Sequence, residues 1–237
     1  MMNTLRCLLL TELLVHAFYA HSQEQPARPF QYYPQAPGFG SFRHAVDISF
    51  GKPPMDLLEE GSYVRVPLLE YDGVFSLPAG FSVEGRVSTI VVSNHVSLGP
   101  RWTWMAGSWG FSVGFDVAYL FGQLEQYGFN NSIKAWINYP CISVGHDFGK
   151  VAITMKAELS IVTSRTVFTD DIEVGSDKNE FNGGSIALFM EQPLWKDNYV
   201  ILGIKMGYLK QWYPTWLVFS TFDKKYVIPE FIIGYIL

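Results

Sequence analysis

The sequence predicts an all-β protein whose antiparallel strands close into a transmembrane up-and-down barrel of about ten strands, within a range of roughly 8–12. Large apolar residues alternate with small or polar ones along many short segments, and successive side chains of a strand point to opposite faces. Charged residues make up only 16% of the chain, which is low for a soluble domain. After the N-terminus, no segment approaches the ~18 uninterrupted apolar residues of a membrane-spanning helix. Alternating strands are then the remaining way to cross lipid.

The segment from Trp109 to Gly122 is the clearest predicted strand. Its odd positions carry large apolar side chains, including Phe115 and Phe121, whereas its even positions carry small or polar residues and one leucine. On a helix these aromatic residues would surround the axis, whereas on a strand they share one face. We therefore expect the odd face to contact lipid and the even face to line a narrow lumen.

The same alternation recurs along the rest of the chain and predicts the remaining strands. The ten predicted ranges are 42–51, 62–71, 80–92, 94–106, 109–122, 134–147, 150–163, 181–193, 199–212 and 226–237. An even number of antiparallel strands returns both termini to the same rim of the barrel.

The connections between the predicted strands differ in length. The short ones lie at 106–108, 147–149 and 194–198. The long ones are polar or rich in Pro, Asn, Asp and Gly, and they lie at 52–61, 123–133, 164–180 and 213–225. Alternation of short and long connections is typical of barrels with tight turns on one rim and longer external loops on the other. A tight connection at Val92–Asn94 and a longer one at 72–79 depart from this rule.

Aromatic residues gather near both kinds of connection. One group flanks a short turn and consists of Trp102, Trp104 and Trp109. The other flanks a long connection and consists of Trp212, Tyr213 and Trp216. Two such groups predict aromatic girdles at the two membrane interfaces.

Residues 1–22 read as a cleaved signal peptide. Arg6 supplies a positive start, a short apolar core follows, and Ala20-His21-Ser22 offers small residues for cleavage before Gln23. The apolar core is too short for a retained membrane anchor. Residues 23–41 are rich in proline and lack periodicity, so they predict an extended linker or an N-terminal arm at the barrel mouth, ahead of a barrel over 42–237.

The signal peptide, the alternating strands and the last strand, FIIGYIL, together resemble the small bacterial outer-membrane β-barrel superfamily over roughly residues 42–237. In these barrels the chain usually ends on an aromatic residue, whereas here it ends on Leu237. The resemblance is architectural. It implies export to the outer membrane, contact with outer-membrane lipid or lipopolysaccharide, and the barrel-assembly machinery as a partner during biogenesis. A soluble lipocalin-like barrel or jelly roll is the competing fold, but it would turn its large apolar face inward.

Charged residues share the small, polar face and should therefore point into the lumen. The predicted lumen charges are Arg43, Asp47, Arg65, Glu84, Arg86, Arg101, Lys156, Glu158, Lys205 and Glu230, together with Asp116, Asp147 and Glu191. Both signs are present, and isolated charges away from water are costly, so we expect them to pair across the interior. A barrel of about ten strands lies nearer to a filled interior than to an open pore. This favours a non-enzymatic structural or adhesive envelope protein, or a narrow solute conduit.

His95, Ser97 and Asp116 form the one candidate catalytic constellation. His95 and Ser97 share a strand face, and Asp116 lies on the next strand, so a nucleophile, a base and an orienting acid could meet. The pattern is similar to the outer-membrane lipid A deacylase family, which implies Ser97 as nucleophile, His95 as base and Asp116 as the orienting residue. In that family the acid is a glutamate and the spacing differs. A lipid-modifying hydrolase is therefore the alternative function, and whether the chain is an enzyme stays open.

Other site classes find little support. The formal charge of −5 is mild and no basic cluster appears, so no nucleic-acid partner is expected. Histidines and carboxylates lack metal-ligand spacing, the acidic stretch 169–173 lacks the pattern of a calcium loop, and no phosphate-cradling glycine loop is present. We therefore expect no metal and no cofactor. The sequence leaves the ligand and the oligomeric state undetermined.

Overall fold

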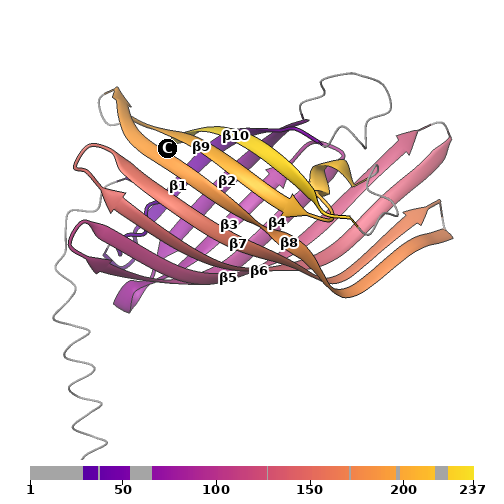
Figure 1. The fold of residues 1–237 in the computed structure, drawn as a ribbon, viewed down its shortest axis with the longest axis horizontal. Helices are drawn as coiled ribbons and strands as arrows, with labels where there is room; N and C mark the ends of the chain where they lie inside the picture. The colour runs from indigo at the N-terminus through magenta and orange to yellow at the C-terminus, as the bar shows by residue number, and fades with distance from the viewer. Residues whose placement is uncertain are drawn as a thin grey trace, which may run out of the picture.

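The computed structural model describes residues 29–36, 38–53, 66–126, 128–170, 172–195, 198–216 and 224–237. Within these ranges, antiparallel strands form one closed barrel in which each strand pairs with its sequence neighbours and β10 closes onto β1 (Figure 1). The predicted fold class and the strand count of ten are confirmed. The strands are β1 (Phe42–Gly51), β2 (Val66–Ser76), β3 (Phe81–Thr89), β4 (Ser93–Ala106), β5 (Trp109–Gln126), β6 (Phe129–Asp147), β7 (Ala152–Thr169), β8 (Ile172–Trp195), β9 (Asn198–Leu209) and β10 (Tyr226–Ile236).

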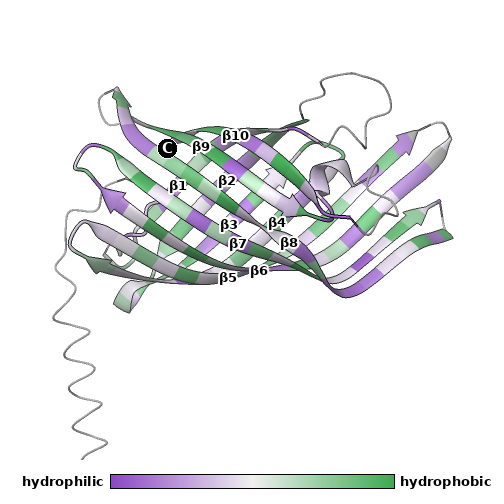
Figure 2. Ribbon diagram, in the orientation of Figure 1, coloured by the Kyte–Doolittle hydropathy of each residue, from purple (hydrophilic) through white to green (hydrophobic). Residues whose placement is uncertain are grey.

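The large apolar side chains point outward and the small or polar ones point inward. On β5, Phe115 is 44% exposed on the outer face, whereas the next residue, Asp116, is 5% exposed on the inner face. On β10, burial alternates at every residue from Tyr226 to Ile236. Hydrophobic and polar residues accordingly alternate along the strands in Figure 2. This is the polarity that a barrel needs in lipid, and it is the reverse of a soluble barrel.

One rim carries the start of β1, the end of β10 and the tight turns, and we call it the tight-turn rim. Ala45 pairs with Ile236 there, and the mark for the C-terminus lies at this end in Figure 1. Gly107 joins β4 to β5 and Gly149 lies between β6 and β7, both with positive φ angles that these turns require. A short 3₁₀ helix, η2 (Pro78–Gly80), joins β2 to β3.

The opposite rim differs from the prediction, because residues 123–126, 129–133, 164–169 and 172–180 belong to strands and not to long loops. The β5–β6 ladder continues to Gln126↔Phe129, and the β7–β8 ladder continues to Thr169↔Ile172. Pairing with β4 and β9 ends well before those tips, so β5–β8 project from the barrel as a four-stranded sheet, hereafter the projecting sheet (Figure 1). The prediction relied on hydrophobic alternation, which is lost where both faces of a strand meet water. The backbone hydrogen bonds between strands do not need that alternation, so the strands continue there.

The segment 72–79 was also predicted wrongly as a connection, since β2 runs to Ser76. The dipeptide Asp72-Gly73 is typical of a turn, which explains the wrong prediction. In the structure it lies within β2: Asp72 faces the lumen and pairs with Arg86, and Gly73 faces outward beneath the Phe42 ring. The connection predicted at Val92–Asn94 is tight, as expected, but it lies at residues 90–92, between β3 and β4, and Val91 adopts a positive φ within it. No helix in the described part of the chain is long and apolar enough to cross a membrane.

Candidate functional site

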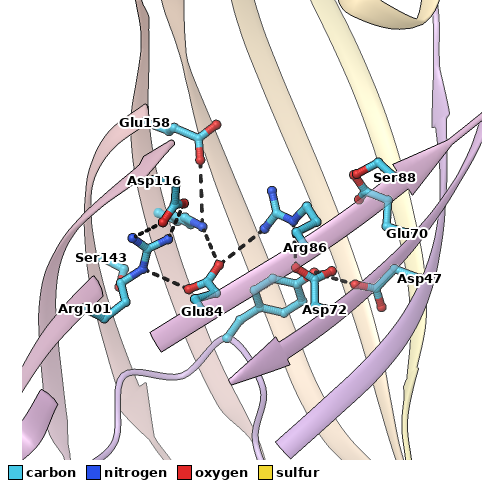
Figure 3. A network of polar contacts seen from close by, with 12 residues as sticks. Asp47, Glu70, Asp72, Glu84, Arg86, Ser88, Arg101, Asp116, Ser143 and Glu158 are labelled. Carbon is cyan, nitrogen blue, oxygen red and sulfur yellow. Dashed lines mark hydrogen bonds and ion pairs between the residues drawn. The ribbon is translucent and has the colours of Figure 1, made fainter. Parts of the chain in front are cut away.

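The middle of the lumen contains an ion-pair network centred on Glu84 of β3 (Figure 3). Its carboxylate lies 2.8 Å from Arg101 Nε on β4, 3.3 Å from Lys156 Nζ on β7 and 3.6 Å from Arg86 Nη2 on its own strand. Strand alternation places all four side chains on the inner face. One acid therefore joins cations from three strands across the interior.

Each of these three cations also binds a further acid on the inner face. Arg101 binds both carboxylate oxygens of Asp116, at 2.9 Å and 2.7 Å, in the bidentate geometry that suits a guanidinium. Arg86 donates to Asp72 at 2.7 Å, and Lys156 lies 3.8 Å from Glu158. Lys205 and Glu230 form a further pair, 3.6 Å apart on β9 and β10.

A glycine makes room for the central arginine. A Cβ atom at Gly114 would lie 2.0 Å from Arg101 Nη1, far inside van der Waals contact, so the guanidinium packs directly on the backbone of β5. The alternation of glycine with charged residues on the lumen face is therefore a packing requirement of the network as well as a strand pattern.

The structure places most of the predicted lumen charges on the inner face, while Arg65 lies outside the described residues. Sequence reasoning missed two lumen acids, Glu70 and Asp72. Glu70 accepts a hydrogen bond from Ser88 at 3.0 Å. With Arg65 inward on the predicted strand 62–71, alternation puts Glu70 on the opposite, lipid-facing side, and Asp72 falls in the predicted connection 72–79. The alternation of Asp72 and Val74 with exposed Phe75 was the signal that could have found the longer strand.

A cavity of about 30 Å³ lies beside this network. Its lining carries equal numbers of acids and bases, namely Glu70, Glu158, Glu230, Arg86, Lys156 and Lys205. A buried water needs at least ~10–15 Å³ and two to four polar partners. The cavity therefore suits roughly two water molecules, and a larger solute would have to displace side chains.

Residues 29–36, hereafter the arm, fill the lumen next to the tight-turn rim. Glu191 of β8 is fully buried and accepts the backbone N–H groups of Gln31, Tyr32 and Tyr33 on its two carboxylate oxygens. Arg43 of β1 donates to the carbonyl oxygen of Phe30. A carboxylate with three N–H donors can stay ionised in a buried site, because each hydrogen bond stabilises its charge.

The aromatic side chains of the arm pack against the inner wall. Tyr32 stacks on Phe189 with ring centroids 3.9 Å apart, and its hydroxyl donates to Asp47. Burial, and then the neighbouring carboxylates Asp47 and Asp72, raise the pKa of Tyr32 well above its ordinary value. The Tyr32 hydroxyl therefore keeps its proton and remains a donor to the acid at neutral pH.

Two glycines on the wall shape the space for the arm. A Cβ at Gly110 would lie 2.0 Å from the carbonyl oxygen of Pro34, and one at Gly145 would lie 2.7 Å from the ring of Tyr33. Tyr33 also donates its hydroxyl to the carbonyl of Ser108, at 2.9 Å. The wall therefore follows the contour of this segment.

The opposite end of the lumen is covered by residues 210–216, hereafter the cap, which include the 3₁₀ helix η3 (Tyr213–Thr215). Trp212 and Trp216 are buried, and Tyr213 stacks on the inward-facing His95. The predicted girdle at this end is therefore wrong for these three residues, which face the lumen and not lipid. A Cβ at Gly51 would lie 2.1 Å from the Trp212 ring, and one at Gly122 would lie 3.0 Å from Trp216 Nε1. Under Trp216 lies an apolar cluster on the inner faces of β5–β7, made of Ala118, Leu120, Ile133, Ala135, Ile137 and Val162.

The predicted catalytic residues share the inner wall but are bonded elsewhere. His95 Nε2 lies 3.2 Å from the Tyr139 hydroxyl, and its ring stacks on Tyr213 of the cap. His95 Nδ1 has no hydrogen-bond partner among the described residues. Asp116 uses both oxygens on Arg101. Within the described residues, no hydrogen bond joins His95 to Ser97 or to Asp116, so the relay that a triad requires is not assembled.

Metal ligands do not gather in the described ranges, where no three His, Cys, Asp or Glu side chains come together as a metal site would require. Cys141 is a free, buried thiol on β6. The arrangement of the lumen is therefore one of paired charges, buried aromatic rings and close backbone packing.

The sequence matches no known family model and no curated protein. Among solved structures, the fold is similar to Neisserial surface protein A, with 13% identity, coverage of 83% of this chain and 96% of that chain, and a TM-score of 0.36. It is also similar to the KdgM porin (10% identity, 81% and 97% coverage, TM-score 0.37) and to outer membrane phospholipase A from Escherichia coli (10%, 93% and 96%, TM-score 0.38). The likeness to small outer-membrane barrels is one of architecture.

Proposed function

We propose that the chain is a non-enzymatic envelope protein of the bacterial outer membrane, exported by a cleaved signal peptide over residues 1–22, with a structural or adhesive role. The observation that carries this proposal is the combination of an apolar exterior with a lumen in which the arm, the ion-pair network and the cap follow one another and leave a cavity of only about 30 Å³ beside the network. Such a barrel anchors a surface feature in lipid and gives solutes little space.

The exterior supports insertion into a bilayer. Outward residues across the middle of the wall are large and apolar, and Val113, Phe115 and Val117 are examples on β5. Near the tight-turn rim, Trp102 and Trp104 have ring centroids 5.1 Å apart. Aromatic residues of this kind prefer the interface between lipid and water, so this rim lies at a membrane interface. Its tight turns place it on the periplasmic side in our proposal, because outer-membrane barrels carry short turns there.

The filled lumen favours the structural role over the narrow conduit. Three barriers follow one another along the interior, namely the arm, the charges around Glu84 and the cap. Paired charges can stiffen a narrow barrel, since each acid gains hydrogen bonds that it would otherwise lack. A conduit would require at least the arm and the cap to move.

The projecting sheet is the proposed contact surface. It extends beyond the strands that flank it, and Figure 2 shows hydrophilic residues along it. Its tip still carries exposed apolar residues, with Ile172 70% exposed and Val174 58% exposed. Binding surfaces are commonly built on segments that a rigid scaffold displays. We propose that this sheet contacts lipopolysaccharide and that the exposed apolar side chains at its tip are part of the contact.

Two measurements on reconstituted protein test this proposal. Wild-type protein in planar bilayers should show no discrete conductance steps, and steps would favour the narrow conduit. Proteoliposomes should bind immobilised lipopolysaccharide, and Ile172→Ser with Val174→Ser should weaken binding. Phe148→Ser, an exposed position on the opposite rim, is the matched control and should bind as wild type does. Equal binding by all three proteins would refute the contact surface.

A further inference from the structure

We propose that the half of the lumen next to the tight-turn rim is a peptide-binding site, and that the arm is its resident, exchangeable ligand. The ligand class is an extended aromatic peptide that presents successive backbone N–H groups. The inference depends on the barrel fold and not on the adhesive role proposed above.

The barrel wall is complete without the arm. No residue of 29–36 belongs to a strand, and the ladders that close the barrel, including the one between β1 and β10, pair strand residues with one another. The arm is held instead by side chains of the wall and by ring packing. Its departure would therefore leave every backbone ladder bond of the wall in place.

Glu191 recognises the peptide backbone. Its carboxylate lies 3.1 Å from Tyr32 N and 2.8 Å from Tyr33 N, and it also accepts from Gln31 N. Hydrogen bonds to an ionised acceptor are stronger than neutral ones. An empty site would leave this buried acid without those donors, so a peptide that supplies them again should bind.

Aromatic contacts add selectivity to this backbone recognition. Phe30 is fully buried and packs edge-on against Tyr199, with ring centroids 5.6 Å apart. Tyr32 lies parallel to Phe189 and bonds to Asp47. A peptide that lacks these rings would keep the contacts to Glu191 but lose much of the buried apolar area.

The wall is shaped for a peptide at two further places. Gly110 and Gly145 leave the space that Pro34 and Tyr33 occupy. Glycine inside a strand weakens the strand and often marks the close approach of another backbone. Larger residues here would fill the lumen without any arm, so these glycines are expected where a separate segment must enter.

Full-length protein with a weakened arm tests the proposal. Phe30→Ser with Tyr33→Ser removes two anchoring rings and changes no residue of the wall. The probe is a fluorescent synthetic peptide with the sequence of residues 29–36, and its anisotropy is followed on titration with the barrel in detergent. The arm variant should bind the probe. The wild type should bind it at least about tenfold more weakly, because a tethered arm competes at a high effective concentration.

Two controls identify the site. Adding Glu191→Gln to the arm variant should weaken binding of the probe by about tenfold or more, since the amide offers one acceptor oxygen to the three backbone N–H groups where the carboxyl group offers two. A peptide of the same composition in scrambled order should bind weakly to every variant. Binding of the scrambled peptide as tightly as the probe would overturn the proposal, because it would indicate adsorption to the apolar exterior.

A folded arm variant, recognised by its heat-modifiable electrophoretic mobility, that does not bind the probe would also overturn it. If the arm variant does not fold, hydrogen exchange of the wild type decides. An exchangeable arm should lose protection of the Tyr32 and Tyr33 amides at least about tenfold faster than β8 and β9 lose theirs, through local opening. If the Tyr32 and Tyr33 amides exchange no faster than those of β8 and β9, the arm opens only when the barrel unfolds, and the proposal is overturned. These outcomes are independent of lipopolysaccharide binding and of conductance.

Discussion

Removing Arg101 should destabilise the barrel strongly, because it breaks a buried ion-pair network. The side chain is buried and donates to Glu84 at 2.8 Å and to Asp116 at 2.9 Å and 2.7 Å. In Arg101→Met, Glu84 keeps Lys156 and Arg86 as partners, whereas Asp116 loses its cation. Leaving one buried charge uncompensated costs about 3–5 kcal/mol. We expect the free energy of unfolding to fall by that amount.

The assay is urea unfolding of protein folded into lipid vesicles, followed by tryptophan fluorescence and linear extrapolation. Lys178→Met replaces an exposed cation of the projecting sheet, beyond the point where β8 pairs with β9, and should change the free energy by no more than about 0.5 kcal/mol. Adding Asp116→Leu to Arg101→Met should recover at least about half of the loss, because both partners are then absent. A loss below about 1 kcal/mol for Arg101→Met alone, or no recovery in the double variant, would refute a dry, ordered network.

Three further outcomes follow from the structure. Phe115→Arg places a charge in the middle of the lipid-facing surface and should lower the free energy of unfolding by about 2–4 kcal/mol in the same vesicle assay, whereas a small effect would mean that this face meets water. Gly110→Leu should displace the arm while the wall stays folded, so hydrogen exchange of the Tyr32 amide should accelerate, and unchanged exchange would contradict the close packing on Pro34. Because no hydrogen bond joins His95 to Ser97 or Asp116, the wild type should release no fatty acid from purified lipid A; release that Ser97→Ala abolishes would establish the lipid-deacylating alternative instead.

Much of the fold could be predicted from the sequence, because lipid imposes a simple pattern. Wherever a strand crosses the apolar layer, its outer residues must be large and apolar, as Val113, Phe115 and Val117 on β5 are. The ladder bonds themselves need no particular side chain, so the pattern disappears where a strand leaves the lipid. This is why the projecting ends of β5–β8 resembled loops.

The lumen could be predicted only in part. Alternation assigns a residue to the inner face, but it does not say which strand across the barrel supplies the partner. Glu84 and Lys156 illustrate this limit, since they are distant in the sequence and 3.3 Å apart. Glu191 is a stronger example: its donors are backbone N–H groups of the arm, and no side-chain pattern marks them.

We propose a lipid-embedded barrel wall from which the projecting sheet extends into water. Nitroxide accessibility along β5 tests it most directly, with one label at each position from 111 to 126 in a Cys141→Ser background and the protein in bilayers. We predict a period of two residues up to Phe121, with oxygen accessibility highest at the odd positions that face outward. A second relaxation agent, soluble in water and not in lipid, is measured on the same labels. From Gln123 onward, outward-facing labels should be accessible to this agent and should lose their high accessibility to oxygen. Water accessibility at 113, 115 and 117, or a period near 3.6 residues, would contradict the account.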